Sequence, residues 1–173
     1  IKARESTIAA VTADYSFAGV HSLGLRPAGL DTLPRQTLIG QIAEQFRAIA
    51  PSEVYLPHPG DAHSDHRIVF EAAASCCKWF RYPSIRKVYA YETLSETGFG
   101  LDPTGQVFTP NTYLNIEGQL QNKLSTLNHY SSELGDFPFP RSVQAVSAQA
   151  QLRGAEAGYT AAEAFQLLYA RHD

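Results

Sequence analysis

The sequence predicts an α/β fold, a Rossmann-like layered sheet that is mostly parallel and carries helices on both faces. Short apolar runs suited to buried strands alternate with longer segments in which apolar residues recur every three or four positions. The order in the first half is helix, strand, helix, strand, helix, which is typical of a doubly wound sheet. With 173 residues and 44% hydrophobic residues, the chain is expected to form a single domain over 1–173.

The first half of the chain contains the clearest alternation. We expect a helix over 3–11, then a loosely alternating strand over 19–25 and a loop rich in Pro and Gly. Apolar residues at helical spacing predict a helix over 36–50, which Pro51 ends. Residues 53–57 are short and apolar enough for a buried parallel strand.

The next helix is expected to begin at Ser64, a good N-cap, with Asp65 in its first turn, where a carboxylate suits the helix dipole. Its apolar residues lie on more than one side, so we expect it to run, deeply buried, to about Phe80. The remaining predicted elements are a strand at 87–92, a flap or hairpin arm at 98–110, a strand at 113–116, a helix with an apolar stripe from Ile116 to Tyr130, a helix at 142–157 and a strand at 164–169.

Composition excludes several classes of function. A net charge of −3 and a pI near 6.1 provide no basic field for nucleic acid. No apolar run approaches the roughly 20 residues of a membrane span, so we expect a cytoplasmic protein. Cys76 and Cys77 are adjacent in a helical pattern and predict small buried side chains without a disulfide. The chain has no Met and opens with Ile1 inside a helical pattern, so we expect a preceding strand and helix to be missing.

One stretch, residues 54–70, gathers the reactive side chains. Three of the six histidines and two aspartates lie in it, where a strand gives way to a helix. His63 and His66 are three residues apart at the helix start and can face one site, and the carboxylate of Asp65 can hold one of the rings. Because ligands of open α/β sheets bind beyond the carboxyl ends of the strands, position and chemistry both favour a zinc site.

The alternative is that these are polar loop residues that cap a helix. A catalytic zinc ion takes three protein ligands and a water, so further ligands would have to come from elsewhere. His21, His129 and His172 have no such neighbours in the sequence, and each is expected to be a surface or locally satisfied histidine.

Residues 61–67, Asp-Ala-His-Ser-Asp-His-Arg, resemble the second motif of the PIG-L/LmbE-like de-N-acetylases, usually His-Pro-Asp-His, with Ser64 in place of the Pro. This family consists of zinc hydrolases that remove acetyl groups from N-acetylglucosamine-type sugars and related glycans. Weaker similarities cover most of the chain, at Tyr91-Glu92, in the helix from Ile116 to Ser132, at Arg153-Gly154 with Gly158, and at 162–165.

The resemblance implies a role for each residue of the motif. His66 would be a zinc ligand, His63 the imidazole that assists at the scissile amide, and Asp65 the residue that orients His63. Asp61 and Arg67 would contact sugar hydroxyls. A zinc-bound water would attack the acetyl carbonyl, with His63, as imidazolium, stabilising the oxyanion or protonating the amine. The implied substrate is an amino sugar linked to a nucleotide or a lipid, and the oligomeric state stays open.

The family's first motif, Ala-His-Pro-Asp-Asp, is absent from this chain, and its nearest imitation, at His58, lies in the wrong loop. By the family's layout it would precede Ile1, so we expect this chain to lack two of three metal ligands and to bind zinc weakly or not at all. Two other interpretations stay open. One is a metallo-β-lactamase-like hydrolase, from the pattern Asp61-x-His63-x-Asp65-His66, and the other is a non-catalytic fragment or glycan-binding relative.

Overall fold

The computed structural model describes residues 2–101 and 105–172, which fall into two compact units. Unit 1 comprises residues 1–21 and 113–163, and unit 2 comprises residues 22–112 and 164–173. The predicted metal-ligand cluster lies entirely within unit 2. The single domain over 1–173 stays a prediction.

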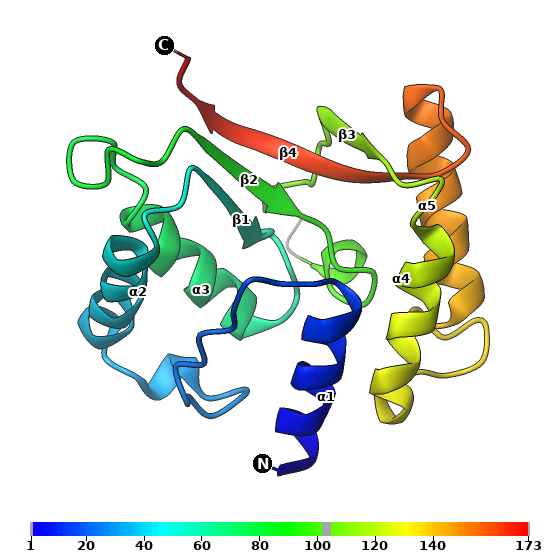
Figure 1. Ribbon diagram of the computed structural model, residues 1–173, viewed down its shortest axis with the longest axis horizontal. Coiled ribbons are helices and arrows are strands. Elements are labelled where there is room, and N and C mark those ends of the chain that lie inside the picture. The colour runs from blue at the N-terminus through cyan, green and yellow to red at the C-terminus, as the bar shows by residue number, and fades with distance from the viewer. Residues whose placement is uncertain (1, 102–104, 173) are drawn as a thin grey trace. The chain divides into compact units, whose positions relative to one another are not determined.

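Unit 2 contains the helix–strand–helix–strand succession that the sequence predicts. These elements are α2 (Arg35–Ile49), β1 (Glu53–Pro57), α3 (Ser64–Ser75) and β2 (Lys87–Tyr91). β1 and β2 pair in parallel, with Glu53 opposite Lys87 and Pro57 opposite Tyr91. Both strands therefore end at the same edge of the sheet, and the loop into α3 leaves from that edge (Figure 1).

The prediction of a mostly parallel sheet is wrong, because the sheet is mixed. β4 (Ala162–Ala170) runs antiparallel to β2, and the order of strands is β1-β2-β4-β3, with β3 at Thr112–Asn115. The backbone N–H of Arg171 donates to the carbonyl of Arg86, so β4 ends beside the start of β2. An apolar strand pattern carries no direction, which is decided by where the preceding segment delivers the chain.

In unit 2 the two α-helices pack against the same face of β1 and β2, and helices on both faces of the whole sheet stay a prediction. Alternate strand residues point to that face. The rings of Tyr55, Tyr89 and Phe165 contact one another on the opposite face. The buried core of this unit consists of Leu30, Leu38, Ile42, Ala43, Val54, Leu56, Ala72, Ala73, Cys76, Tyr82, Ile85 and Val88.

Unit 1 contains the three remaining α-helices: α1 (Lys2–Asp14), α4 (Leu120–Leu127) and α5 (Val143–Ala157). A 3₁₀-helix, Asn128–Glu133, follows α4. The Ser142 hydroxyl caps α5 by accepting from the backbone N–H of Ala145 at 3.1 Å. Gly158, with φ of +79°, ends that helix in the left-handed conformation.

Two further predictions of secondary structure need correction. Residues 19–25 form no strand, because Gly24 is left-handed at φ +64° and the side chains of Leu23 and Leu25 pack on the core instead. α3 ends at Ser75 rather than near Phe80. The hydroxyl of Ser75 bonds back to the carbonyl of Ala72, and the next two amides tighten to three-residue hydrogen bonds.

Other predictions are met or lie partly outside the description. Both cysteines are free, Cys76 is buried, and burial raises the pKa of the Cys77 thiol to about 11. In the predicted flap at 98–110, a 3₁₀-helix spans Thr97–Phe99, while residues 102–104 lie outside the described residues. The four strands of the described chain do not favour the many-stranded metallo-β-lactamase-like alternative. None of the described helices is long and apolar enough to span a bilayer.

Candidate active site

The cluster is placed by the loop that joins the carboxyl end of β1 to the first turn of α3. The N-cap of α3 is His63 rather than the predicted Ser64. The ring Nδ1 of His63 accepts a hydrogen bond from the backbone N–H of Asp65 at 3.1 Å. A side chain that caps a helix start in this way satisfies one of the backbone donors that the helix leaves unpaired.

This cap defines the state of the His63 ring. Since Nδ1 accepts a hydrogen bond, the neutral imidazole must carry its proton on Nε2. That Nε2–H has no partner among the described residues, so it is a hydrogen-bond donor without an assigned acceptor. The ring of His66 stacks on that of His63, with centroids 5.2 Å apart and an interplanar angle of 21°.

His66 is held by Asp61 through a short hydrogen-bond chain. The Asp61 carboxylate is completely buried, and its Oδ2 lies 2.7 Å from Nδ1 of His66. The other oxygen, Oδ1, accepts from the Thr97 hydroxyl at 2.6 Å, and that hydroxyl itself accepts from the backbone N–H of Thr93 at 2.7 Å. A carboxylate only accepts, so Nδ1 of His66 carries a proton, and Nε2 is the bare nitrogen of the neutral ring.

The same contact perturbs the titration of His66. The hydrogen bond that His66 donates to Asp61 raises the pKa of His66 above its ordinary value, and the charges of Asp61, Glu96 and Asp65 add to this, against the opposing effect of burial. Burial and the nearby Asp61 charge likewise raise the pKa of Tyr91. The negative charge of Asp61 therefore acts on both His66 and Tyr91.

Asp65 makes a different contact from the predicted one. Its carboxylate does not hold His63; Oδ2 accepts from the backbone N–H of Ala28 at 2.7 Å, and Oδ1 accepts from that of Leu30 at 3.2 Å. Those two amides belong to the segment that precedes α2, more than 30 positions from Asp65. Their contact with Asp65 could not be predicted from spacing in the sequence. Asp65 thus ties that loop to the first turn of α3.

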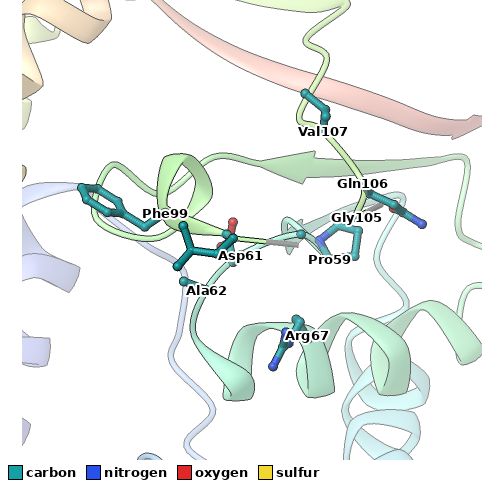
Figure 2. Close-up of a pocket in the computed structure, with 11 residues that line it drawn as sticks. Pro59, Asp61, Ala62, Arg67, Phe99, Gly105, Gln106 and Val107 are labelled. Carbon is teal, nitrogen blue, oxygen red and sulfur yellow. The ribbon is translucent and has the colours of Figure 1, made fainter. Parts of the chain in front are cut away.

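Arg67 lines a cavity of about 330 Å³ beside this loop. Figure 2 shows three groups of lining residues: the loop after β1, the first turn of α3, and the segments around Phe99 and Gln106. Asp61 also lines the cavity, but both its oxygens are engaged. Both predicted substrate-contacting residues therefore line the cavity, and Asp61 is also a partner of His66 and Thr97.

The cavity wall depends on close backbone approach at Gly60. A Cβ built there would lie 2.2 Å from the carbonyl oxygen of Gln106, and one at Gly100 would lie 2.6 Å from that of Gly60. Nε2 of the buried His58 also lies 3.0 Å from the Gln106 carbonyl. Only glycine, which has no Cβ, permits such close contacts, so the cavity wall requires glycine at positions 60 and 100.

The donor set meets only part of the needs of a zinc ion. His66, backed by a carboxylate, has the arrangement that orients an imidazole ligand. Across residues 2–101 and 105–172, however, no three His, Cys, Asp or Glu side chains lie so that they could hold a metal ion. The described residues therefore do not complete a zinc site by themselves.

Sequence reasoning missed Thr97, Thr93 and the two backbone amides that Asp65 binds. Thr97 lies 36 positions from Asp61, in a loop with no motif of its own, so no local pattern marks it. The other three histidines fit their prediction. His21 and His172 are exposed, and His129 bonds Asp14 at 2.9 Å within unit 1.

Comparison with known proteins yields similarity of fold. No family model matches the chain, and no curated protein matches it significantly. One similar structure is the conserved protein TT1542 from Thermus thermophilus, with a TM-score of 0.74, 21% identity, and coverage of 99% of this chain and 75% of that one.

Two further structures are described as deacetylases. N,N'-diacetylchitobiose deacetylase from Pyrococcus horikoshii has a TM-score of 0.76 at 16% identity and covers 97% of this chain. The zinc-inhibited form of teicoplanin deacetylase Orf2 has a TM-score of 0.57 at 14% identity and covers 99%. The chain spans 64% and 75% of their respective lengths. These likenesses show a shared fold.

Proposed function

We propose that the full-length protein is an amide hydrolase that removes an acetyl group from an N-acetylated amino sugar or glycoconjugate. The observation that carries this proposal is the pair His63 and His66, whose rings stack with each Nδ1 held and each Nε2 without a partner among the described residues. The deacetylases that share the fold support the same class of reaction.

In this proposal His63 acts on the acetyl carbonyl. Its neutral ring offers an Nε2–H, which would donate to the carbonyl oxygen, and this hydrogen bond would strengthen as negative charge develops in the transition state. The helix-capping bond fixes the ring before substrate arrives, so little reorganisation is needed. The proposal thus assigns a neutral donor in place of the imidazolium expected from the sequence. The group that orients the ring is the backbone N–H of Asp65 and not its carboxylate.

His66 is proposed as the zinc ligand of the full-length protein, with the other ligands coming from outside the described residues. When bound, a zinc ion would supply Lewis acidity and activate a water. Asp61 and Thr97 act as positioning residues that hold the proton of the neutral His66 ring on Nδ1, which leaves Nε2 as the bare nitrogen of that tautomer. The Asp61–His66 bond can be tested without metal, since the tautomer of His66 is visible in its ring ¹⁵N shifts.

Arg67 and the cavity are proposed to hold the sugar, since the guanidinium offers five donors in a cavity otherwise walled largely by backbone and apolar side chains. A nucleotide or lipid linked to that sugar stays a prediction, as do the cytoplasmic location and the oligomeric state.

The proposal is tested by acetate release from N-acetylated sugars, comparing the full-length protein with His63→Ala and His66→Ala. Loss of one oxyanion donor is expected to lower kcat by about 100-fold or more for His63→Ala. His21→Ala is the matched control, because His21 is exposed and far from the cluster in sequence. Undiminished turnover in either variant would refute the role proposed for that histidine. Sugar binding without acetate release by the unaltered protein would refute the hydrolase and favour a glycan-binding protein.

A separate measurement addresses the metal. Calorimetric titration of the 173-residue chain with zinc is expected to show weak binding or none, because the described residues hold no group of three side chains able to bind a metal ion. Tight stoichiometric zinc would contradict this expectation.

A further inference from the structure

A second surface lies beyond the other end of α3, in the turn from Lys78 to Arg81. The backbone N–H groups of Arg81 and Tyr82 both donate to the carbonyl of Lys78, at 2.9 and 3.0 Å. The turn is anchored from below, since Tyr82 and Ile85 are buried and the Tyr82 ring meets Phe46 edge-on at 6.1 Å. In Figure 1 the segment between α3 and β2 extends as a loop beyond the end of α3.

The turn presents two large aromatic rings to solvent. Trp79 is 56% exposed and Phe80 is 63% exposed, and the two rings meet edge-on with centroids 6.0 Å apart. The Arg81 guanidinium lies over the Phe80 ring, 5.9 Å from its centroid. The backbone beneath the rings is anchored, and the two rings form a contiguous exposed apolar patch, a feature that marks interaction surfaces.

The charge around the rings is positive. Lys78 and Arg81 are exposed and form no ion pair with a carboxylate in the described chain. Arg171 donates to the carbonyl of Pro83 at 2.7 Å, and Arg47 lies close enough to act on Tyr82 electrostatically. Since the whole chain carries −3, this positive charge is local to the turn.

We propose that the Lys78–Arg81 turn docks on an anionic lipid surface. Trp rings favour the headgroup region of a bilayer, and flanking cations are attracted to anionic lipids. A protein partner fits less well, since a stable interface buries about 800 Å² on each side and a four-residue turn offers far less. The attachment is peripheral, weak and reversible, and it is independent of the proposed hydrolase.

Trp79 is the only tryptophan of the chain, so its fluorescence reports directly on this turn. The experiment adds vesicles of phosphatidylcholine, with or without phosphatidylglycerol, to the protein at pH 7. Anionic vesicles are expected to shift the emission to the blue and to cosediment with the protein, and added salt is expected to reverse both. Neutral vesicles are expected to do neither.

The double variant Lys78→Glu with Arg81→Glu keeps the reporter and is expected to weaken binding by about 25-fold or more, since each cation contributes about 5-fold near an anionic surface. The matched control is Arg4→Glu with Arg26→Glu, which changes the net charge equally at two other exposed positions. Phe80→Ser tests the aromatic contribution and is also expected to weaken binding.

Three results would overturn the proposal. An unchanged emission with anionic vesicles would assign the aromatic pair to another partner, such as a protein. An equal shift with neutral vesicles would remove the role of the cations. An equal loss of binding in the control variant would show a general charge effect instead of a docking turn. Far-UV circular dichroism of every variant separates these results from misfolding.

Discussion

The two ends of α3 differ in how far the neighbouring side chains are buried and hydrogen-bonded. In the loop just before the first turn, Asp61 is completely buried, and each of its oxygens has a specific donor. Just beyond the last turn, the backbone of the Lys78–Arg81 turn is anchored by buried neighbours while its side chains project into solvent. One end fixes side chains, and the other fixes only the backbone.

This difference follows from the chemistry of the side chains at each end. A buried carboxylate is stable only when its hydrogen bonds are satisfied, so the geometry around Asp61 is over-determined. Exposed rings impose no such requirement, and they are free to meet a surface from outside. Substitutions should therefore be costly to folding at the first end and nearly neutral at the second.

The largest effect is expected from Asp61→Ala, which leaves the Thr97 hydroxyl and Nδ1 of His66 without their acceptor. We expect a loss of about 3 kcal/mol in the free energy of unfolding, measured by urea denaturation. Asp31→Ala removes an exposed carboxylate and is the control, with a change below about 0.5 kcal/mol. Equal losses in both variants would mean that the Asp61 contacts do not stabilise the fold.

Gly60→Ala should follow, since its methyl group would lie 2.2 Å from the Gln106 carbonyl. A backbone shift of this kind costs about 2 kcal/mol. Gly40→Ala is the control; nothing lies within 4 Å of a Cβ there, and the position is inside α2. Replacing glycine inside a helix should stabilise by up to about 1 kcal/mol. Opposite signs are expected, and a stabilising Gly60→Ala would contradict the close approach.

Asp65→Ala should have an intermediate effect of about 1.5 kcal/mol, because two backbone donors lose their acceptor but lie nearer to solvent. Hydrogen exchange should accelerate at the amides of Ala28 and Leu30. Unchanged exchange at both amides would contradict their hydrogen bonds to Asp65.

The pH dependence of stability should show the Asp61–His66 pair. The folded pKa of His66 is raised above the unfolded value near 6.5, so the contribution is fully present below about pH 6.5 and is lost as pH rises through the folded pKa. The difference in unfolding free energy between the unaltered protein and Asp61→Asn should therefore be larger at pH 6 than at pH 9. A difference independent of pH would rule out this linkage.

The smallest effect is expected from Trp79→Ser, beyond the other end of α3. The ring is more than half exposed, so the free energy of unfolding should change by less than about 0.5 kcal/mol. A loss of about 2 kcal/mol or more in urea denaturation would show that the ring packs in the core, and the contrast between the two ends would fail.

Much of unit 2 could be predicted because its signals are local. The helical spacing of α2, the apolar strand β1 and the dense cluster after it are all visible in short windows. The limits of α3 were harder to predict. Ser64 and His63 can both cap a helix, and the folded geometry places His63 at the N-cap. The strand expected at 19–25 failed because alternation of apolar residues does not supply a neighbouring strand to pair with.

The sequence by itself indicated which residues are candidates for the site, and that they gather where a strand meets a helix: His63, His66, Asp61, Asp65 and Arg67. Only the tertiary structure decided how they are paired. Asp61 binds His66 and Thr97, and Asp65 binds the amides of Ala28 and Leu30. It also decided that β4 runs antiparallel. The physical reason is that hydrogen-bond partners and strand direction depend on segments tens of residues apart, which meet only when the chain has folded.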